Sequence, residues 1–242
     1  MLSYFHKVVS LLQKEGYEAT ALDLPSMNTS LRDQGKAPGM YDDADHVRSA
    51  VSRSLDEGKD AVIVASSYGG AVTFEACKGL SKEQREKEGG QLKHLVLLGV
   101  LLCEPGIAVK ELIGEDFDPV AGSLGSDSTT HLPPLPASLG GHLLCGSLTE
   151  EEQAHYLAMA KSISIQAFMQ PITYVGWKHV PTTLVIGDKD NIPSPQKQEE
   201  SFSEAVRTTG GKNLKKVIVN NGDHLTMLSH AKEVVSVCLD VV

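Results

Sequence analysis

The segment AVIVASSYGGAVTFEAC, residues 61–77, decides the fold of this chain. Its apolar start, residues 61–64, predicts a buried strand, and residues 71–77 have the composition of a helix. Ser67 lies in the turn between them, and the residues two positions away, Ala65 and Gly69, are both small. A strand, a tight turn and a helix around a serine are typical of a nucleophile elbow, in which a strained backbone exposes a reactive hydroxyl group. An ordinary strand-to-helix turn that contains a serine fits this segment equally well.

Strands and helices alternate along most of the remaining sequence. Hydrophobic spacing predicts strands at 18–24, 60–65, 94–102, 182–187 and 215–219. Helices are predicted at 4–15, 42–55, 70–80, 195–207 and 229–239, and residues 26–40 have the composition of a loop. This alternation predicts an α/β fold, with a mostly parallel sheet and helices on both of its faces.

Residues 104–179 interrupt this alternation. Gly, Ser and Pro are frequent in 118–141, which predicts irregular structure. Residues 148–169 have a helical pattern that begins with a Ser/Thr and Glu capping signal. We therefore expect residues 1–103 and 180–242 to form the core, and residues 104–179 to form a lid inserted over the sheet.

The composition limits the classes of partner. The 242 residues carry a formal net charge of −9, 41% of them are hydrophobic, and Lys and Arg form no cluster. Because nucleic acids and anionic membranes bind concentrated positive charge, we expect neither as a partner, and expect a small organic molecule instead. The sequence has no metal-ligand spacing, dinucleotide fingerprint or phosphate loop, which predicts an activity without a metal or cofactor.

The cysteines and the N-terminal sequence favour a cytoplasmic location. Cys77, Cys103, Cys145 and Cys238 have neither CxxC nor disulfide-framework spacing, which indicates free thiols in a reducing compartment. The first predicted helix carries charged residues where a signal peptide would be apolar, and no apolar segment is long enough to span a membrane. The oligomeric state cannot be predicted from these features.

Two further residues lie where a serine nucleophile would need them. A serine hydroxyl is a weak nucleophile until a histidine removes its proton, and a carboxylate orients that histidine. His224 follows the last predicted strand, and Asp190 follows the strand at 182–187. Sites in open α/β sheets form at these carboxyl ends of the strands. Ser67, Asp190 and His224 are therefore a candidate catalytic triad, and the other histidines are expected to be surface or packing residues.

Three segments resemble one branch of a known family. Residues 15–25 (EGYEATALDLP), 66–70 (SSYGG) and 222–228 (GDHLTML) look like the methylesterase and hydroxynitrile lyase branch of the α/β-hydrolase superfamily, whose triad has the same chain order. The similarity covers most of the chain and is weakest between about residues 104 and 158. It implies an α/β-hydrolase fold and a cofactor-free esterase, lactonase or cyanohydrin lyase, with Ser67 as nucleophile and His224 as base.

The resemblance leaves three candidates for the acid. The superfamily usually places the carboxylate three residues after the glycine that ends the strand, which selects Asp190. The segment between this acid and Ile192–Pro193 is one residue shorter than in the family, so Asp188 also remains a candidate. Glu104 is the third, because some relatives place the acid just after the strand predicted at 94–102.

The sequence departs from the family at the elbow and near its start. Ala65 and Ser66 stand where relatives often have Gly and His. Relatives begin with a central strand and a His-Gly loop that supplies one N–H of the oxyanion hole, and no such segment precedes Tyr4 here. This difference has three possible explanations. The sequence is a shortened gene model, or a variant in which the flanking strands pair directly, or a remnant that binds without turnover. With the Tyr68 N–H as the sole donor, we expect weak activity.

The leading expectation is hydrolysis of a small carboxylic ester or lactone through an acyl-enzyme on Ser67. The pocket walls are expected to include Phe168, Met169, Tyr174 and Trp177. A carbon–carbon lyase is an alternative, and it would need a cation near the anion that forms, for which the lid offers Lys161 and Lys178. A catalytically inert homologue that binds a small molecule is the third possibility.

Overall fold

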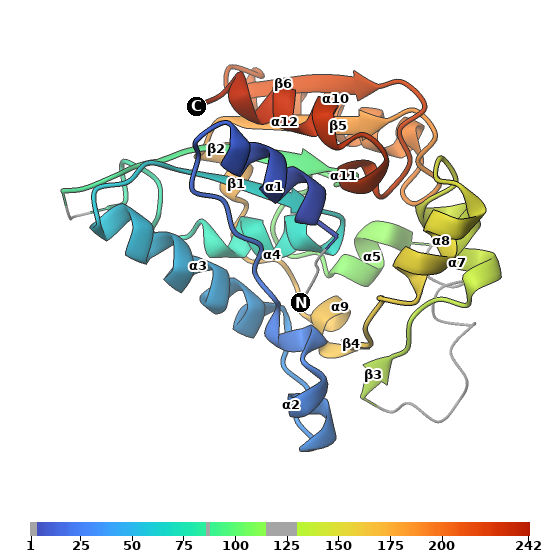
Figure 1. The fold of residues 1–242 in the computed structure, drawn as a ribbon. Helices are drawn as coiled ribbons and strands as arrows, with labels where there is room; N and C mark the ends of the chain where they lie inside the picture. The colour runs from blue at the N-terminus through green and yellow to red at the C-terminus, as the bar shows by residue number, and fades with distance from the viewer. Residues whose placement is uncertain (1–3, 86–87, 115–129) are drawn as a thin grey trace.

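Four parallel strands form the central sheet of the computed structural model, which describes residues 4–85, 88–114 and 130–242 (Figure 1). Their order in the sheet is β1-β2-β5-β6. The strands are β1 (Ala61–Ser66), β2 (Leu92–Leu98), β5 (Thr182–Gly187) and β6 (Leu214–Val219). The α/β fold with a parallel sheet is thus confirmed, and four of the predicted strands are present.

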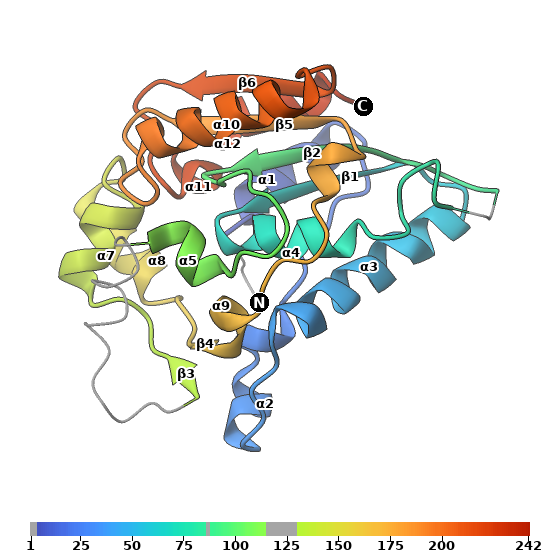
Figure 2. The ribbon, with the colours of Figure 1, turned by 180° about the vertical axis from the view of Figure 1, so that it is seen from behind.

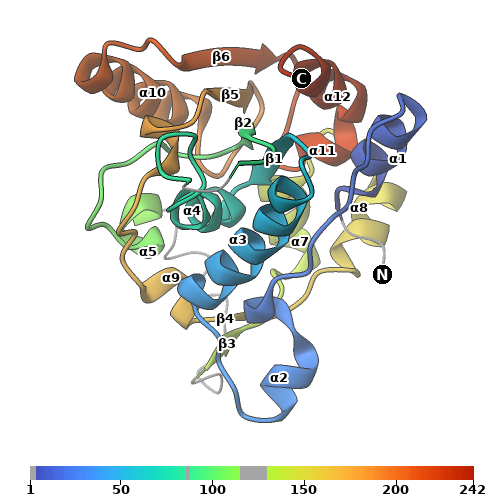
Figure 3. The same ribbon diagram turned by 90° about the vertical axis from the view of Figure 1, so that its left-hand side faces the viewer.

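Helices cover both faces of the sheet (Figure 3). One face packs against α3 (Met40–Asp56), α4 (Tyr68–Ala76) and α10 (Pro195–Thr209), and the other against α1 (His6–Lys14), α11 (Thr226–Ser229) and α12 (Ala231–Leu239). Successive side chains of a strand point to opposite faces. Leu95 and Leu97 of β2 therefore pack in the first layer and Val96 and Leu98 in the second, and all four are fully buried. This explains why β2 is apolar along most of its length.

The strand predicted at residues 18–24 is wrong. This segment is irregular and mostly exposed, with Leu22 39% exposed. A strand is stabilised by a hydrogen-bonded neighbour. Among the strands that the structure describes, β1 forms the edge of the sheet and pairs with β2 alone. The residues of β1 are consequently only partly buried, apart from Ala65.

The segment predicted as a loop at 26–40 contains two short helices. They are η1 (Pro25–Met27) and α2 (Thr29–Asp33). The side chain of Asn28 accepts hydrogen bonds from the N–H groups of Ser30 and Leu31, and this cap stabilises α2 although its composition is that of a loop.

The segment 104–179 contains α5 (Val109–Ile113), β3 (His131–Leu132), α7 (Ala137–Leu144), α8 (Glu150–Leu157), β4 (Ile163–Ser164), α9 (Gln166–Met169) and η3 (Gly176–Lys178). Of these elements, α7 and α8 lie beside the carboxyl ends of the strands (Figure 2). The helical pattern predicted at 148–169 corresponds to two helices, α8 and α9, and the strand β4 lies between them and pairs with β3. Thr149 and Glu152 form the predicted type of capping box at the start of α8. Residues 118–129 of the segment predicted as irregular lie outside the described residues, whereas 137–141 belong to α7.

The four cysteines are free and buried, and the prediction of free thiols is confirmed. Among the residues that the structure describes, no helix is both long enough and apolar enough to cross a membrane. The reducing compartment stays a prediction.

Candidate active site

Ser67 occupies the turn between β1 and α4 in a strained backbone conformation. Its φ is 53° and its ψ is −125°, a region that residues with a side chain rarely adopt. Holding a residue there costs about 1–3 kcal/mol. A methyl group at Gly69 would lie 3.7 Å from the Cβ of Ala65, so the turn leaves little room for larger side chains. The geometry expected of a nucleophile elbow is thus present.

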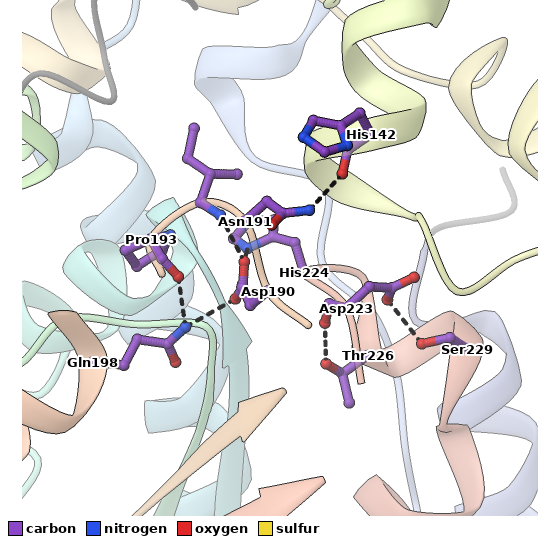
Figure 4. A network of polar contacts seen from close by, with 10 residues as sticks. His142, Asp190, Asn191, Pro193, Gln198, Asp223, His224, Thr226 and Ser229 are labelled. Carbon is purple, nitrogen blue, oxygen red and sulfur yellow. Dashed lines mark hydrogen bonds and ion pairs between the residues drawn. The ribbon is translucent and has the colours of Figure 1, made fainter. Parts of the chain in front are cut away.

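His224 and Asp190 face each other in the loops that follow β6 and β5. His224 Nδ1 lies 3.1 Å from Asp190 Oδ1 and 3.2 Å from Asp190 Oδ2. The exposed fraction is 4% for His224 and 2% for Asp190. Figure 4 shows the two side chains within a wider network of hydrogen bonds. Asp190 is an acceptor here, so the imidazole carries its proton on Nδ1 and leaves Nε2 as the basic nitrogen.

The two loops meet because β5 and β6 are parallel neighbours that end at the same edge of the sheet. The N–H of Lys189 donates to the carbonyl of Gly222 at 2.8 Å, and the N–H of Asp188 donates to the carbonyl of Val219 at 3.1 Å. A methyl group on Gly187 would collide with the backbone of Gly222, so the loops approach more closely than larger residues would allow.

The structure selects one of the three candidate acids as the neighbour of His224. Asp188 is exposed, and its side chain has no hydrogen bond to His224. Glu104 is also exposed and pairs with Lys178 at 2.5 Å. Asp190 alone is buried against the imidazole, and its Oδ1 also accepts a hydrogen bond from the N–H of Ile192 at 2.9 Å.

The electrostatic surroundings favour protonation of His224. Burial works to lower the pKa of its imidazole, but the charge and hydrogen bond of Asp190 and the charge of Asp223 together raise the pKa above 6.5. Burial also raises the pKa of Asp223, against the effect of hydrogen bonds from Ser229 and Ser147. Asp223 thus places a second carboxyl group near the base.

Two residues of the segment 104–179 form hydrogen bonds to these loops. The carboxylate of Asp223 accepts a hydrogen bond from the N–H of Ser147 at 3.0 Å, and Asn191 Nδ2 donates to the carbonyl of His142 at 2.9 Å. Figure 4 shows the second of these contacts. Displacement of α7 would therefore disturb the loops that carry Asp190 and His224.

Ser67 and His224 line one cavity of about 200 Å³. Its other walls are apolar and include Val100, Leu112, Ile113, Leu144, Phe168 and Ile192. Among the described residues that line the cavity, none is an Asp, Glu, Lys or Arg. Such a site suits a small, uncharged ligand.

Of the four aromatic and methionine side chains expected in the pocket wall, Phe168 is the one that lines this cavity. Met169 points to solvent and is 43% exposed. Tyr174 stacks on His179, with 5.0 Å between the ring centroids. Trp177 lies in the core, where its Nε1 donates to the carbonyl of Cys103 at 3.1 Å. The expectation for these three is corrected, because hydrophobic character alone does not distinguish a pocket wall from the core.

Tyr68 follows Ser67 as the first residue of α4, and a helix provides no acceptor for the N–H of its first residue. Its side chain is anchored by a hydrogen bond in which Oη donates to Asp43 Oδ2 at 2.6 Å. Asp43 is fully buried and also accepts hydrogen bonds from the N–H and the hydroxyl of Ser26 at 2.8 and 2.5 Å. Burial raises the pKa of both Asp43 and Tyr68. Sequence reasoning did not identify Asp43 or Ser26.

Gly99 is another residue that sequence reasoning missed. It follows β2 with a φ of +60°, and it borders the cavity beside Asp190 and His224. A methyl group at this position would lie 2.9 Å from Asp190 Oδ2 and 3.1 Å from His224 Nδ1. A glycine inside an apolar strand pattern signals such a close approach.

The two lysines considered for a lyase are engaged elsewhere. Lys161 pairs with Asp23 at 2.9 Å. Lys178 pairs with Glu104 and lies over the Trp177 ring, 5.3 Å from its centroid. Neither lysine is among the residues that line the cavity.

Comparison with known proteins adds a family match. A family model described as the alpha/beta hydrolase family matches residues 2–237. The chain is 26% identical over 223 residues to a protein named "Probable hydrolase R7" from a Phoma species, an alignment that covers 90% of this chain and 84% of that protein. It is 24% identical over 191 residues to alpha/beta hydrolase nvfD from Aspergillus novofumigatus, which covers 77% and 72%.

Solved structures resemble the chain over almost its whole length. Polyneuridine aldehyde esterase matches with a TM-score of 0.73 at 18% identity, over 98% of this chain and 93% of that one. Tomato methylketone synthase I, complexed with 2-tridecanone, matches with a TM-score of 0.75 at 15% identity, over 98% and 92%. The methylesterase MES16 from Arabidopsis matches with a TM-score of 0.71 at 18% identity, over 98% and 92%. At these identities the structures support the fold alone.

Proposed function

The chain belongs to the alpha/beta hydrolase family, and from this premise we propose that it is a serine hydrolase that cleaves small carboxylic esters or lactones through an acyl-enzyme on Ser67. One observation carries the proposal. The serine in the strained turn and the buried histidine held by Asp190 line the same apolar cavity. Esterases among the structural neighbours, polyneuridine aldehyde esterase and the methylesterase MES16, are consistent with ester cleavage.

In the proposed mechanism, Ser67 Oγ attacks the carbonyl carbon and His224 Nε2 takes the hydroxyl proton. Asp190 accepts the Nδ1–H bond, so the imidazole keeps the tautomer that can act as a base. The tetrahedral oxygen anion accepts a hydrogen bond from the Tyr68 N–H. Collapse of this intermediate breaks the bond to the leaving oxygen, which receives the proton from His224. A water molecule, deprotonated by His224, then releases the carboxylic acid and restores Ser67.

The proposed oxyanion hole includes the N–H of Tyr68, which lies at the start of α4. Loss of one oxyanion-hole donor typically lowers turnover by about 10²–10³-fold. We propose that hydrolysis is fastest for esters whose alcohol is a good leaving group, because such esters need little stabilisation of the anion.

The cavity defines the substrate class further. Its volume of about 200 Å³ is below the range of roughly 300–1,000 Å³ that holds drug-sized ligands. A carboxylate or ammonium group would lose its hydration in this apolar cavity without gaining a charged partner, which is costly. We propose uncharged esters with short apolar acyl groups as substrates.

A panel of p-nitrophenyl esters from acetate to octanoate tests the proposal, together with a neutral lactone. Turnover of the short esters that disappears in Ser67→Ala supports it. A second arm measures cyanide release from mandelonitrile, because the same triad could serve a carbon–carbon lyase. Cyanide release without ester turnover would replace esterase by lyase, and tight ester binding without turnover would indicate an inert homologue.

A further inference from the structure

A glutamine on α10 forms a hydrogen bond to the candidate acid. Gln198 is fully buried, and its Nε2 donates to Asp190 Oδ2 at 2.9 Å and to the carbonyl of Pro193 at 2.8 Å. Figure 4 shows this amide nitrogen pointing at both acceptors. The position lies in the first turn of α10, where the N–H of Gln198 also donates to the carbonyl of Ser194 at 3.1 Å.

The other end of the Gln198 amide has no partner. Its Oε1 is buried and accepts no hydrogen bond among the described residues. Leaving a buried acceptor unpaired destabilises a fold, so a methionine or leucine would be expected at a purely structural position of this kind. Exchanging the positions of Nε2 and Oε1 would not be favourable, because Oε1 would then face two other acceptors, the carboxylate of Asp190 and the carbonyl of Pro193. The two acceptors therefore determine how the amide is oriented.

The hydrogen bonds to Asp190 together restrict rotation of its carboxylate. Oδ1 accepts from the N–H of Ile192 and Oδ2 accepts from Gln198, while both oxygens lie within 3.2 Å of His224 Nδ1. Without Gln198, Oδ2 would keep only its contact with the imidazole, and the carboxylate could turn about its terminal bond. A carboxylate whose two oxygens both accept hydrogen bonds allows the imidazole a smaller range of orientations than a carboxylate with one such oxygen.

We propose that Gln198 is a positioning residue of the active site, which fixes the Asp190 carboxylate in the orientation that aligns His224 toward Ser67. This inference rests on the proposed serine hydrolase function. Among the described residues, the charged side chains that raise the pKa of His224 are Asp190 and Asp223. A purely structural role, in which Gln198 only anchors Pro193, would leave the behaviour of His224 unchanged.

Two variants and a matched control separate these roles. Gln198→Met keeps a side chain of similar size and removes the donor. Gln198→Glu keeps the shape and places a second carboxyl group against Asp190. Gln196→Glu is the control, because Gln196 is exposed on the same helix and bonds only to Glu200. Thermal unfolding of each full-length variant shows whether it is folded.

The first readout is turnover of a short p-nitrophenyl ester. Gln198→Met should lower kcat about tenfold or more while KM stays within about twofold. This loss is smaller than the roughly 10⁴-fold drop that follows when a triad carboxylate is disabled, since Asp190 is still present. A folded Gln198→Met protein with the kcat of the wild type would overturn the proposal.

The second readout is the pH titration of the His224 imidazole by ¹H–¹³C NMR, assigned from the signal that is missing in His224→Asn. Gln198→Glu should extend the titration to higher pH by about one unit or more, because an added negative charge near the pair favours the imidazolium. The Gln196→Glu curve should match the wild type. The titration needs no substrate, so it tests Gln198 even if no ester is hydrolysed. A Gln198→Glu curve identical to the wild type would overturn the proposal.

Discussion

Replacing Gly99 by alanine should lower turnover far more than it lowers stability. The added methyl group would lie 2.9 Å from Asp190 Oδ2, whereas ordinary contacts of this kind begin at 3.4 Å. Atoms must therefore move by at least about 0.5 Å, the difference between these distances. Asp190 and His224 cannot turn toward solvent to relieve the contact, because both are buried and hydrogen-bonded to each other. The hydrogen bond between Asp190 and His224 must therefore lengthen or break.

The structure sets the size of this effect. Misplacing reacting groups by 1 Å can cost about 10²-fold in rate, so a shift of half that size predicts a loss of about tenfold or more in kcat. The positive φ of +60° adds a backbone cost of about 1–2 kcal/mol, which for a chain of this length lowers Tm by about 2–8 °C.

A matched glycine separates the two effects. Gly35 has a φ of +71°, and a methyl group added there would have no atom within 4 Å, so Gly35→Ala bears the backbone cost without the collision. Both variants are assayed with a p-nitrophenyl ester and by thermal unfolding. Gly99→Ala and Gly35→Ala should lower Tm by similar amounts. Only Gly99→Ala should also lower kcat. Equal kcat in the two variants would refute the reasoning.

Three other perturbations of the site have defined outcomes. Asp190→Asn should lower kcat by up to about 10⁴-fold, whereas Asp188→Asn should have no measurable effect, and equal losses in the two would contradict the assignment of the acid. The value of kcat/KM should fall as the pH drops through the pKa of His224, because the protonated imidazole cannot accept the serine proton. The pH–rate profile should therefore have a midpoint above pH 6.5. A midpoint at or below 6.5 would contradict the expectation that Asp190 and Asp223 outweigh the effect of burial on this pKa. Phe168→Ala should enlarge the cavity and raise the ratio of octanoate to acetate hydrolysis, and an unchanged ratio would place the acyl group elsewhere.

The parts of the fold that could be predicted from the sequence are those with strong local signals. The strand at 182–187 matches β5 residue for residue, and the start of α10 at Pro195 was also predicted, since proline is favoured in the first turn of a helix. Residues 18–24 have the composition of a strand but no partner, and strand formation depends on a neighbour that local sequence does not reveal.

Part of the candidate site could also be predicted, because some of its residues lie in strong local sequence patterns. Ser67, Asp190 and His224 could be proposed because each follows a recognisable strand, and parallel strands bring their carboxyl ends to one edge. Asp43 and Gln198 lie inside helices, where an acidic residue or a glutamine gives no sign of burial. Their roles depend on contacts between elements distant in sequence, which only the folded chain brings together.

Covalent labelling of Ser67 tests the central claim most directly. The wild-type protein is treated with a fluorophosphonate, and the modified peptide is identified by mass spectrometry, with Ser67→Ala and the adjacent Ser66→Ala as comparisons. The strained turn and the neighbouring base predict one label, on Ser67, that is lost in Ser67→Ala and kept in Ser66→Ala. Labelling that persists in Ser67→Ala, or no labelling of the folded wild-type protein, would contradict the account of Ser67 as an activated nucleophile.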